Sequence, residues 1–174
     1  KLETQQQAES FLVSCKHAHY TVHSIETKPG KKSPAPPFTT STLQQEASRK
    51  LGLSIDRTMR IAQQLYEAGH ITYMRTDSLN LSTVATSAAK KVIEEEYGSQ
   101  YALSKPRVYK STSKGAQEAH EAIRPVNLAL KPSEIKPYVD NMQYKLYSLI
   151  WKRTLATQMA QAKIANTTYK IEAG

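Results

Sequence analysis

The segment from residue 28 to residue 37 constrains the fold of this chain more than any other. Its sequence, KPGKKSPAPP, holds four prolines and one glycine. Proline fixes φ and cannot donate an amide hydrogen bond, and glycine adds backbone freedom. We therefore expect no regular structure here, and interpret the segment as a linker or an extended crossing between two parts of the chain.

Different patterns lie on the two sides of this segment. Before it, apolar residues at helical spacing predict a helix over 4–17, and alternation predicts a strand over 19–26. After it, capping residues and helical spacing predict helices at 40–51, 54–68, 81–97 and 141–161. The other expected elements are a loop at 98–118, a helical turn at 132–134 and a last strand at 163–172.

This order predicts a mainly α chain with a few flanking β-strands. One interpretation is a helical unit, residues 38–162, inserted into a β-rich domain that supplies residues 1–37 and 163–174. A terminal strand needs partners, and the chain begins with Lys1 rather than Met. We therefore expect it to be a piece of a longer protein.

Composition points to a polyanion as a partner. The 174 residues carry 24 Lys and Arg against 15 Asp and Glu, a net charge of +9, and the isoelectric point is near 9.6. Basic residues are spread along the chain, which favours a folded positive surface over a disordered arm. General solubility is the alternative explanation of this charge.

Other features indicate a cytoplasmic protein without a membrane span. Apolar residues make up 39 % of the chain, mean hydropathy is −0.56, and no run approaches the roughly 18 apolar residues of a transmembrane helix. No signal peptide is visible. The single cysteine, Cys15, excludes an internal disulfide framework, and its place in an apolar helical pattern predicts packing.

Residues 69–82 contain the highest density of side chains suited to catalysis. Hydroxyl groups, one cation and one carboxylate lie close to Tyr73 in the sequence. If this run is extended, Tyr73 and Arg75 project to the same side. A phenol has a pKa of about 10 and needs activation, while arginine can hold two phosphate oxygens. The pair suits a tyrosine nucleophile acting on a phosphate; an ordinary exposed surface pair is the alternative.

Two helices joined at Gly52 and followed by this segment are similar to a winged helix-turn-helix. On that interpretation the second helix would present polar side chains to DNA, namely Arg57, Arg60 and Gln63 or Gln64. A plain helical hairpin explains the pattern equally well.

A second polar patch covers residues 116–125. His120-Glu121 begins like a zinc-protease helix, but Arg124 stands where the second histidine is required, so we expect no zinc site. His120 can instead donate to a phosphate, relay a proton or pack locally. No Asp-x-Asp pair or other acidic metal cluster is evident, so we expect any metal ligands to lie outside this chain.

Three segments together resemble bacterial DNA topoisomerase I, a type IA topoisomerase. They are residues 36–48 (PPFTTSTLQQEAS), 65–78 (LYEAGHITYMRTDS) and 118–125 (EAHEAIRP). The resemblance extends over the whole chain, including residues 149–153 (LIWKR).

This resemblance implies roles for the two polar patches. Tyr73 would attack a phosphodiester in single-stranded DNA and form a 5′-phosphotyrosyl link, and Arg75 would hold the scissile phosphate. His120 would lie at the DNA-binding cleft. Further support in binding DNA would come from Thr72, Thr76, Asp77, Ser78 and Arg124.

The resemblance also implies what the chain lacks. The helical domain would have a winged-helix-like core and hinge on a β-rich arch domain. The Toprim domain with its Mg²⁺ site, and the domain that completes the DNA groove, are missing from this sequence. The whole enzyme would relax negative supercoils in the bacterial nucleoid without ATP, whereas this fragment alone would be inactive. The alternatives are a winged-helix module that reads duplex DNA without catalysis and a structural partner-binding domain.

Overall fold

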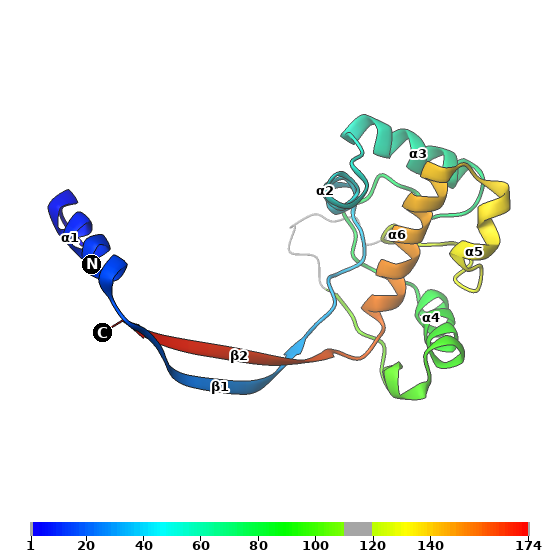
Figure 1. Cartoon of the computed structure of the whole chain (residues 1–174). Helices are drawn as coiled ribbons and strands as arrows, with labels where there is room; N and C mark the ends of the chain where they lie inside the picture. Colours follow the sequence, from blue (N-terminus) through cyan, green and yellow to red (C-terminus); the bar gives the residue numbers. More distant parts are fainter. Residues whose placement is uncertain (1, 110–119, 174) are drawn as a thin grey trace. The chain divides into compact units, whose positions relative to one another are not determined.

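A computed structural model describes residues 2–109 and 120–173, drawn in Figure 1. The chain divides into two compact units. The ribbon unit comprises residues 1–32 and 162–174, and the helical unit comprises residues 33–161. The expected loop at 98–118 falls partly outside the described residues.

The ribbon unit consists of one helix and two long antiparallel strands. They are α1 (Gln5–His17), β1 (Tyr20–Lys32) and β2 (Ala162–Ala173). The ladder runs from Tyr20 opposite Ala173 to Lys32 opposite Ala162. Cys15 is partly buried, while no described residue of α1 is fully buried, so the packing expected around Cys15 stays a prediction.

Strand β1 continues through Pro29 and Gly30, so the prediction of an irregular segment was wrong for residues 28–32 and right only for 33–37. Each strand of a two-stranded ribbon has an open edge, where proline is tolerated. Gly30 lies close to side chains of the partner strand: a Cβ there would lie 2.7 Å from Asn166 Nδ2 and 3.0 Å from Ile164 Cγ1, so a larger residue would require these side chains to shift.

The four long helices expected in the helical unit are present. They are α2 (Thr40–Leu51), α3 (Ile55–Glu67), α4 (Thr83–Glu96) and α6 (Asn141–Thr157), with the short α5 at Pro132–Ile135 and 3₁₀ turns at Ser99–Tyr101 and Lys136–Tyr138. A side-chain oxygen caps the start of each long helix; the capping residues are Thr39, Ser54, Ser82 and Asp140.

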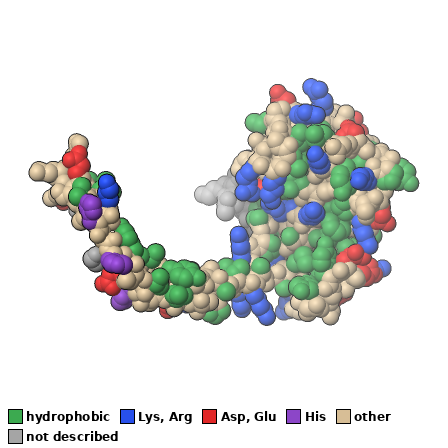
Figure 2. All heavy atoms as spheres, in the orientation of Figure 1, with side chains coloured by type: hydrophobic (Ala, Val, Ile, Leu, Met, Phe, Trp, Pro, Cys, Tyr) green, Lys and Arg blue, Asp and Glu red, His purple; other side chains and the backbone are tan. Residues whose placement is uncertain are grey.

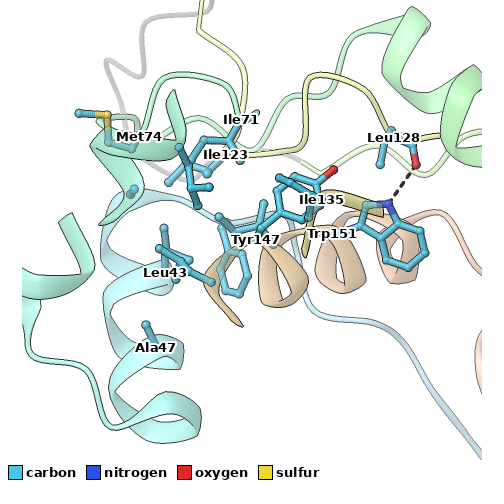
Figure 3. Close-up of a cluster of buried hydrophobic side chains, with 14 of the residues drawn as sticks. Leu43, Ala47, Ile71, Met74, Ile123, Leu128, Ile135, Tyr147 and Trp151 are labelled. Carbon is cyan, nitrogen blue, oxygen red and sulfur yellow. Dashed lines mark hydrogen bonds between the residues drawn. The ribbon is translucent and has the colours of Figure 1, made fainter. Parts of the chain in front are cut away.

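Helix α6 is the centre of this unit and contacts α2, α3, α4 and α5. It ends at Thr157 rather than Gln161, because the chain beyond it pairs Met159 with Ala102. Tyr147 and Trp151 project from α6 into the core (Figure 3). Their polar atoms are satisfied there: Tyr147 Oη donates to the Leu130 carbonyl at 2.7 Å, and Trp151 Nε1 donates to the Leu128 carbonyl at 2.9 Å.

The prediction of a mainly α chain with flanking strands is therefore confirmed for the described residues. The winged-helix-like core and the insertion into a β-rich domain remain predictions. None of the described helices has the length and apolar character needed to cross a membrane.

Candidate active site

The structure brings the three motif segments together. Phe38 forms a bridge with Ile123, and Ile71 forms a bridge with Pro125. The segment that starts at His120 therefore lies between the chain that enters α2 and the chain that leaves α3. Residues more than 80 positions apart in sequence become neighbours around the Tyr73 segment.

Thr72 fixes the start of the Tyr73 segment. Its amide donates to the Arg124 carbonyl at 2.9 Å, its hydroxyl donates to the Ala122 carbonyl at 2.8 Å, and that hydroxyl accepts from the Arg124 amide at 3.0 Å. These bonds hold the backbone immediately before Tyr73 in place. In this geometry Thr72 acts on the site by positioning its neighbour.

Tyr73 and Arg75 are both exposed, and Met74 between them is buried. The segment has bends at Thr72 and Met74 and is not a regular strand, although burial still alternates as an extended run would require. The Tyr73 side chain is 43 % exposed, and its ring packs edge-on against Tyr66 with centroids 5.2 Å apart. The phenol is therefore accessible and its ring has a fixed neighbour.

Thr40, at the first turn of α2, holds the backbone on both sides of Arg75. The Thr40 amide donates to the Thr76 carbonyl at 2.9 Å, and the Thr76 amide donates back to the Thr40 hydroxyl at 2.9 Å. That hydroxyl also donates to the Met74 carbonyl at 2.8 Å. The sequence marks Thr40 only as a helix-capping residue in the TTST stretch of the first motif segment, and not as a residue of the site.

A hollow of about 370 Å³ lies where α2 begins. Its lining unites four of the expected site residues with the first residues of α2; the lining residues are Thr39, Thr40, Ser41, Arg75, Thr76, Asp77 and His120. Tyr73 is not among them, although it precedes Arg75 by only two positions. We call this space the Arg75 hollow.

Ser78 and Arg124 lie near the Arg75 hollow but are turned to structural contacts. Ser78 is 2 % exposed, and its hydroxyl accepts from the Asn80 amide at 3.1 Å. The side chain of Arg124 is 13 % exposed and forms an ion pair with Glu121, while its Nη1 donates to the Pro125 carbonyl at 2.9 Å. Both side chains shape the loops that carry the site.

Glu121 ties this ion pair to helix α4. One carboxylate oxygen accepts from the Ser82 amide at 2.7 Å, at the start of that helix. Burial raises the pKa of Glu121, but hydrogen bonds from Arg124 and Ser82 outweigh it, so the net pKa lies below its usual value. The carboxylate form is thus the one that holds the His120 segment to α4.

The Arg75 hollow has the chemistry of an anion site. Arg75 and His120 supply a guanidinium and an imidazole, and the first turn of α2 presents the positive end of a helix dipole. Asp77 is the one carboxylate among the described lining residues. A phosphate group fits this balance of charge and donors.

No metal centre is evident in the described ranges 2–109 and 120–173, where no three His, Cys, Asp or Glu side chains lie close enough to hold an ion. These residues therefore do not fit a Mg²⁺ site, and the placement of its ligands outside this chain stays a prediction.

The structure supports the winged helix-turn-helix interpretation less well than it supports an anion site. The polar residues named as candidates to face DNA are all exposed on α3: Arg57, Arg60, and the two alternatives Gln63 and Gln64. However, the chain after α3 is not a strand, so no β-wing follows that helix in the described residues.

Comparison with known proteins places this architecture. A family model described as DNA topoisomerase matches residues 1–174. DNA topoisomerase 1 of Zymomonas mobilis is 49 % identical over 168 residues, covering 97 % of this chain and 13 % of that protein. DNA topoisomerase 1 of Synechocystis is 53 % identical over 146 residues, covering 83 % and 16 %. The structure of full-length topoisomerase I from Thermotoga maritima superposes with a TM-score of 0.73 at 38 % identity, covering 97 % of this chain and 27 % of that one.

Fold and sequence thus define a chain of the DNA topoisomerase class. It belongs to the bacterial topoisomerase I family, of type IA. The chain spans only 13 % and 16 % of the two curated relatives that it matches, and nothing in these matches favours a module that only reads duplex DNA.

Proposed function

We propose that Tyr73 is the nucleophile of a type IA topoisomerase reaction on single-stranded DNA. The Tyr73 oxygen attacks the phosphorus of a phosphodiester. The bond from phosphorus to the 3′ oxygen breaks, the phenol loses its proton, and the departing 3′ oxygen gains one. The products are a 5′-phosphotyrosyl link and a free 3′ hydroxyl. Attack by that hydroxyl reverses the step, so no ATP is consumed.

The observation that carries this proposal is that Arg75, only two residues after Tyr73, lines a hollow with the chemistry of an anion site. Arg75 lines the Arg75 hollow together with His120, and buried Met74 anchors the backbone between Tyr73 and Arg75. A phosphate bound there would place a guanidinium where negative charge develops in the transition state. His120 would bind DNA and assist proton handling.

The other site residues would support this chemistry from a distance. Thr72, Thr76 and Ser78 hold the loop, and Arg124 anchors the segment of His120. Asp77 lies in the lining of the hollow, where it would orient Arg75 or the DNA. The role of each in DNA binding is part of the proposal.

The rest of the reaction belongs to the whole protein. We place the Toprim domain, its Mg²⁺ and the groove-completing domain elsewhere in the polypeptide, so none of the steps above depends on them. The whole enzyme would pass the intact strand through the break and relax negative supercoils in the bacterial nucleoid.

The test is Tyr73→Phe in the full-length protein. Because only the nucleophilic oxygen is removed, we expect the covalent adduct to disappear while single-stranded DNA binding is largely kept. The measurement is trapping of 3′-end-labelled DNA on the denatured protein, since the downstream fragment is the one that stays attached.

Tyr66→Phe is the matched control, because Tyr66 is an exposed tyrosine whose ring touches that of Tyr73. It should retain the adduct. An adduct that persists in Tyr73→Phe would assign the nucleophile to another residue and refute the proposal.

A further inference from the structure

A second hollow lies between α2 and α6, with a volume of about 560 Å³. It shares no lining residue with the Arg75 hollow. Ser41 lines the Arg75 hollow and Lys50 the second one, at opposite ends of α2; a rise of 1.5 Å per residue separates them by about 14 Å along the helix axis. We call the second hollow the α2–α6 groove.

Four cations line this groove: Lys50, Lys145, Lys152 and Arg153. The described lining contains no carboxylate. Figure 2 shows lysine and arginine side chains, interrupted by hydrophobic ones, over the face of the helical unit that carries α2 and α6. A polyanion is the ligand that this charge distribution attracts.

The four cations are not equally available. Lys50 and Arg153 both approach Glu46, at 2.9 Å and 3.4 Å. Arg153 also lies 4.2 Å over the Phe38 ring, so it is part of the packing between α6 and the start of α2. Lys145 and Lys152 are exposed and make no ion pair with a described residue. Those two lysines are therefore the free charges of the groove.

Between these charges the groove has an apolar floor. Leu51 and Leu149 line it, together with the partly exposed ring of Tyr144. Lys145 and Lys152 are two helical turns apart on α6, or about 10 Å. Single-stranded nucleic acids bind where cations meet phosphates and flat apolar or aromatic surfaces meet bases. A duplex keeps its base faces stacked and would use only the charges.

We propose that the α2–α6 groove binds single-stranded DNA at a site separate from the Arg75 hollow. Phosphates would contact Lys145 and Lys152, and a base would lie against Leu149 and Tyr144. The choice of DNA as the polyanion rests on the proposed function, whereas the groove itself does not involve Tyr73.

The test uses this chain, a fluorescein-labelled 12-mer of thymidine, and anisotropy across a salt series. Lys145→Ala with Lys152→Ala should weaken binding about tenfold at low salt. It should also flatten the slope of log K against log salt by about 1.4, from two lost phosphate contacts at about 0.7 each. Thermal melts by circular dichroism check that the variant is folded.

Lys90→Ala with Lys91→Ala is the matched control, because it removes the same charge from α4, where both lysines pair with glutamates. It should change affinity less than twofold. An equal loss in both variants would reduce the effect to net charge and overturn the proposal. Two other probes test the same double variant. The proposal would also be overturned if Lys145→Ala with Lys152→Ala weakened binding only to a poly-glutamate peptide, or weakened binding to a blunt duplex as much as to the single strand.

Photocross-linking gives a second readout that depends on the base. A 12-mer carrying 5-iododeoxyuridine should cross-link to the peptide that contains Tyr144. The Lys145/Lys152 double variant should lose this product, and Tyr73→Phe should keep it. Cross-links found only at Tyr66 or Tyr73 would refute the groove while leaving the proposed cleavage function intact.

Discussion

Tyr147 is the largest fully buried side chain of the helical unit, and it keeps a polar atom inside the core. Its hydroxyl donates to the Leu130 carbonyl, so neither group is left unsatisfied. Burial raises the pKa of Tyr147 well above its ordinary value, with a further contribution from the charge of Glu134. The folded chain therefore retains a proton that the unfolded chain releases near pH 10.

This difference predicts how stability depends on pH. The contribution of the protonated phenol is complete below about pH 10 and is lost as the pH rises further, because only the unfolded state gains the ionised form. Between pH 8 and pH 10.5 the wild-type chain should lose about 0.8 kcal/mol more unfolding free energy than Tyr147→Phe. Urea denaturation of both proteins at the two pH values measures this.

At pH 8 the same variant should be about 1 kcal/mol less stable than wild type, since the Leu130 carbonyl loses its donor. Equal losses of stability in the two proteins between the two pH values would mean that Tyr147 ionises in the folded state as it does in the unfolded one.

Some residues of the candidate site can be recognised from the sequence, and others cannot. Tyr73 and Arg75 are recognisable because their chemistry is local, two positions apart in one segment. Thr40 is not, because its value to the site comes from hydrogen bonds to Met74 and Thr76, more than thirty positions away. Arg124 is recognisable in the sequence as a candidate cation for DNA, whereas its ion pair with Glu121 is found only in the structure.

Gly52 decides the geometry between α2 and α3 at the scale of elements. It has φ of 66° and ψ of 24°, and its amide donates to the carbonyls of the last turn of α2. A Cβ at this position would meet no atom within 4 Å, so any cost of a side chain comes from the backbone alone.

Gly52→Ala should therefore lower the unfolding free energy by about 1 kcal/mol. Gly52→Asn should cost less, because asparagine adopts the left-handed conformation more readily. Thermal or urea unfolding of the two variants compares them directly. If Gly52→Ala left the unfolding free energy unchanged, the turn would have to relax to another conformation in the variant.

Elements were predictable where local signals were strong. Helices α2, α3 and α4 begin at capping residues and follow clear apolar spacing. The end of α6 was missed because the pairing of Met159 with Ala102 stops it, and no local breaker does. The prediction of irregular structure at Pro29 and Gly30 was wrong for a similar reason. Whether these residues end a strand depends on the partner strand, which lies far along the sequence.

At the scale of the whole molecule, the proposed function assigns this chain only part of the groups that strand cleavage would need. On the proposed function it would supply Tyr73, Arg75 and His120, while its described residues offer no cluster for a metal ion. It covers 27 % of the Thermotoga topoisomerase I chain. The groups that complete the reaction are expected in the remainder.

We therefore expect this chain alone to leave negatively supercoiled plasmid unrelaxed in the presence of Mg²⁺. The full-length protein should relax it under the same conditions, as read by agarose gel electrophoresis. Relaxation by the isolated chain at a rate comparable with the intact enzyme would show that the rest of the polypeptide is dispensable.

The two ends of the helical unit meet. Ser33 and Gln161, its first and last residues, are joined by a side-chain hydrogen bond of 2.7 Å. A domain whose ends are adjacent tolerates circular permutation. A short peptide could join residue 161 to residue 33, and new termini could be placed in a surface loop. The order of the helices along the sequence could thus be changed while their packing in space is kept.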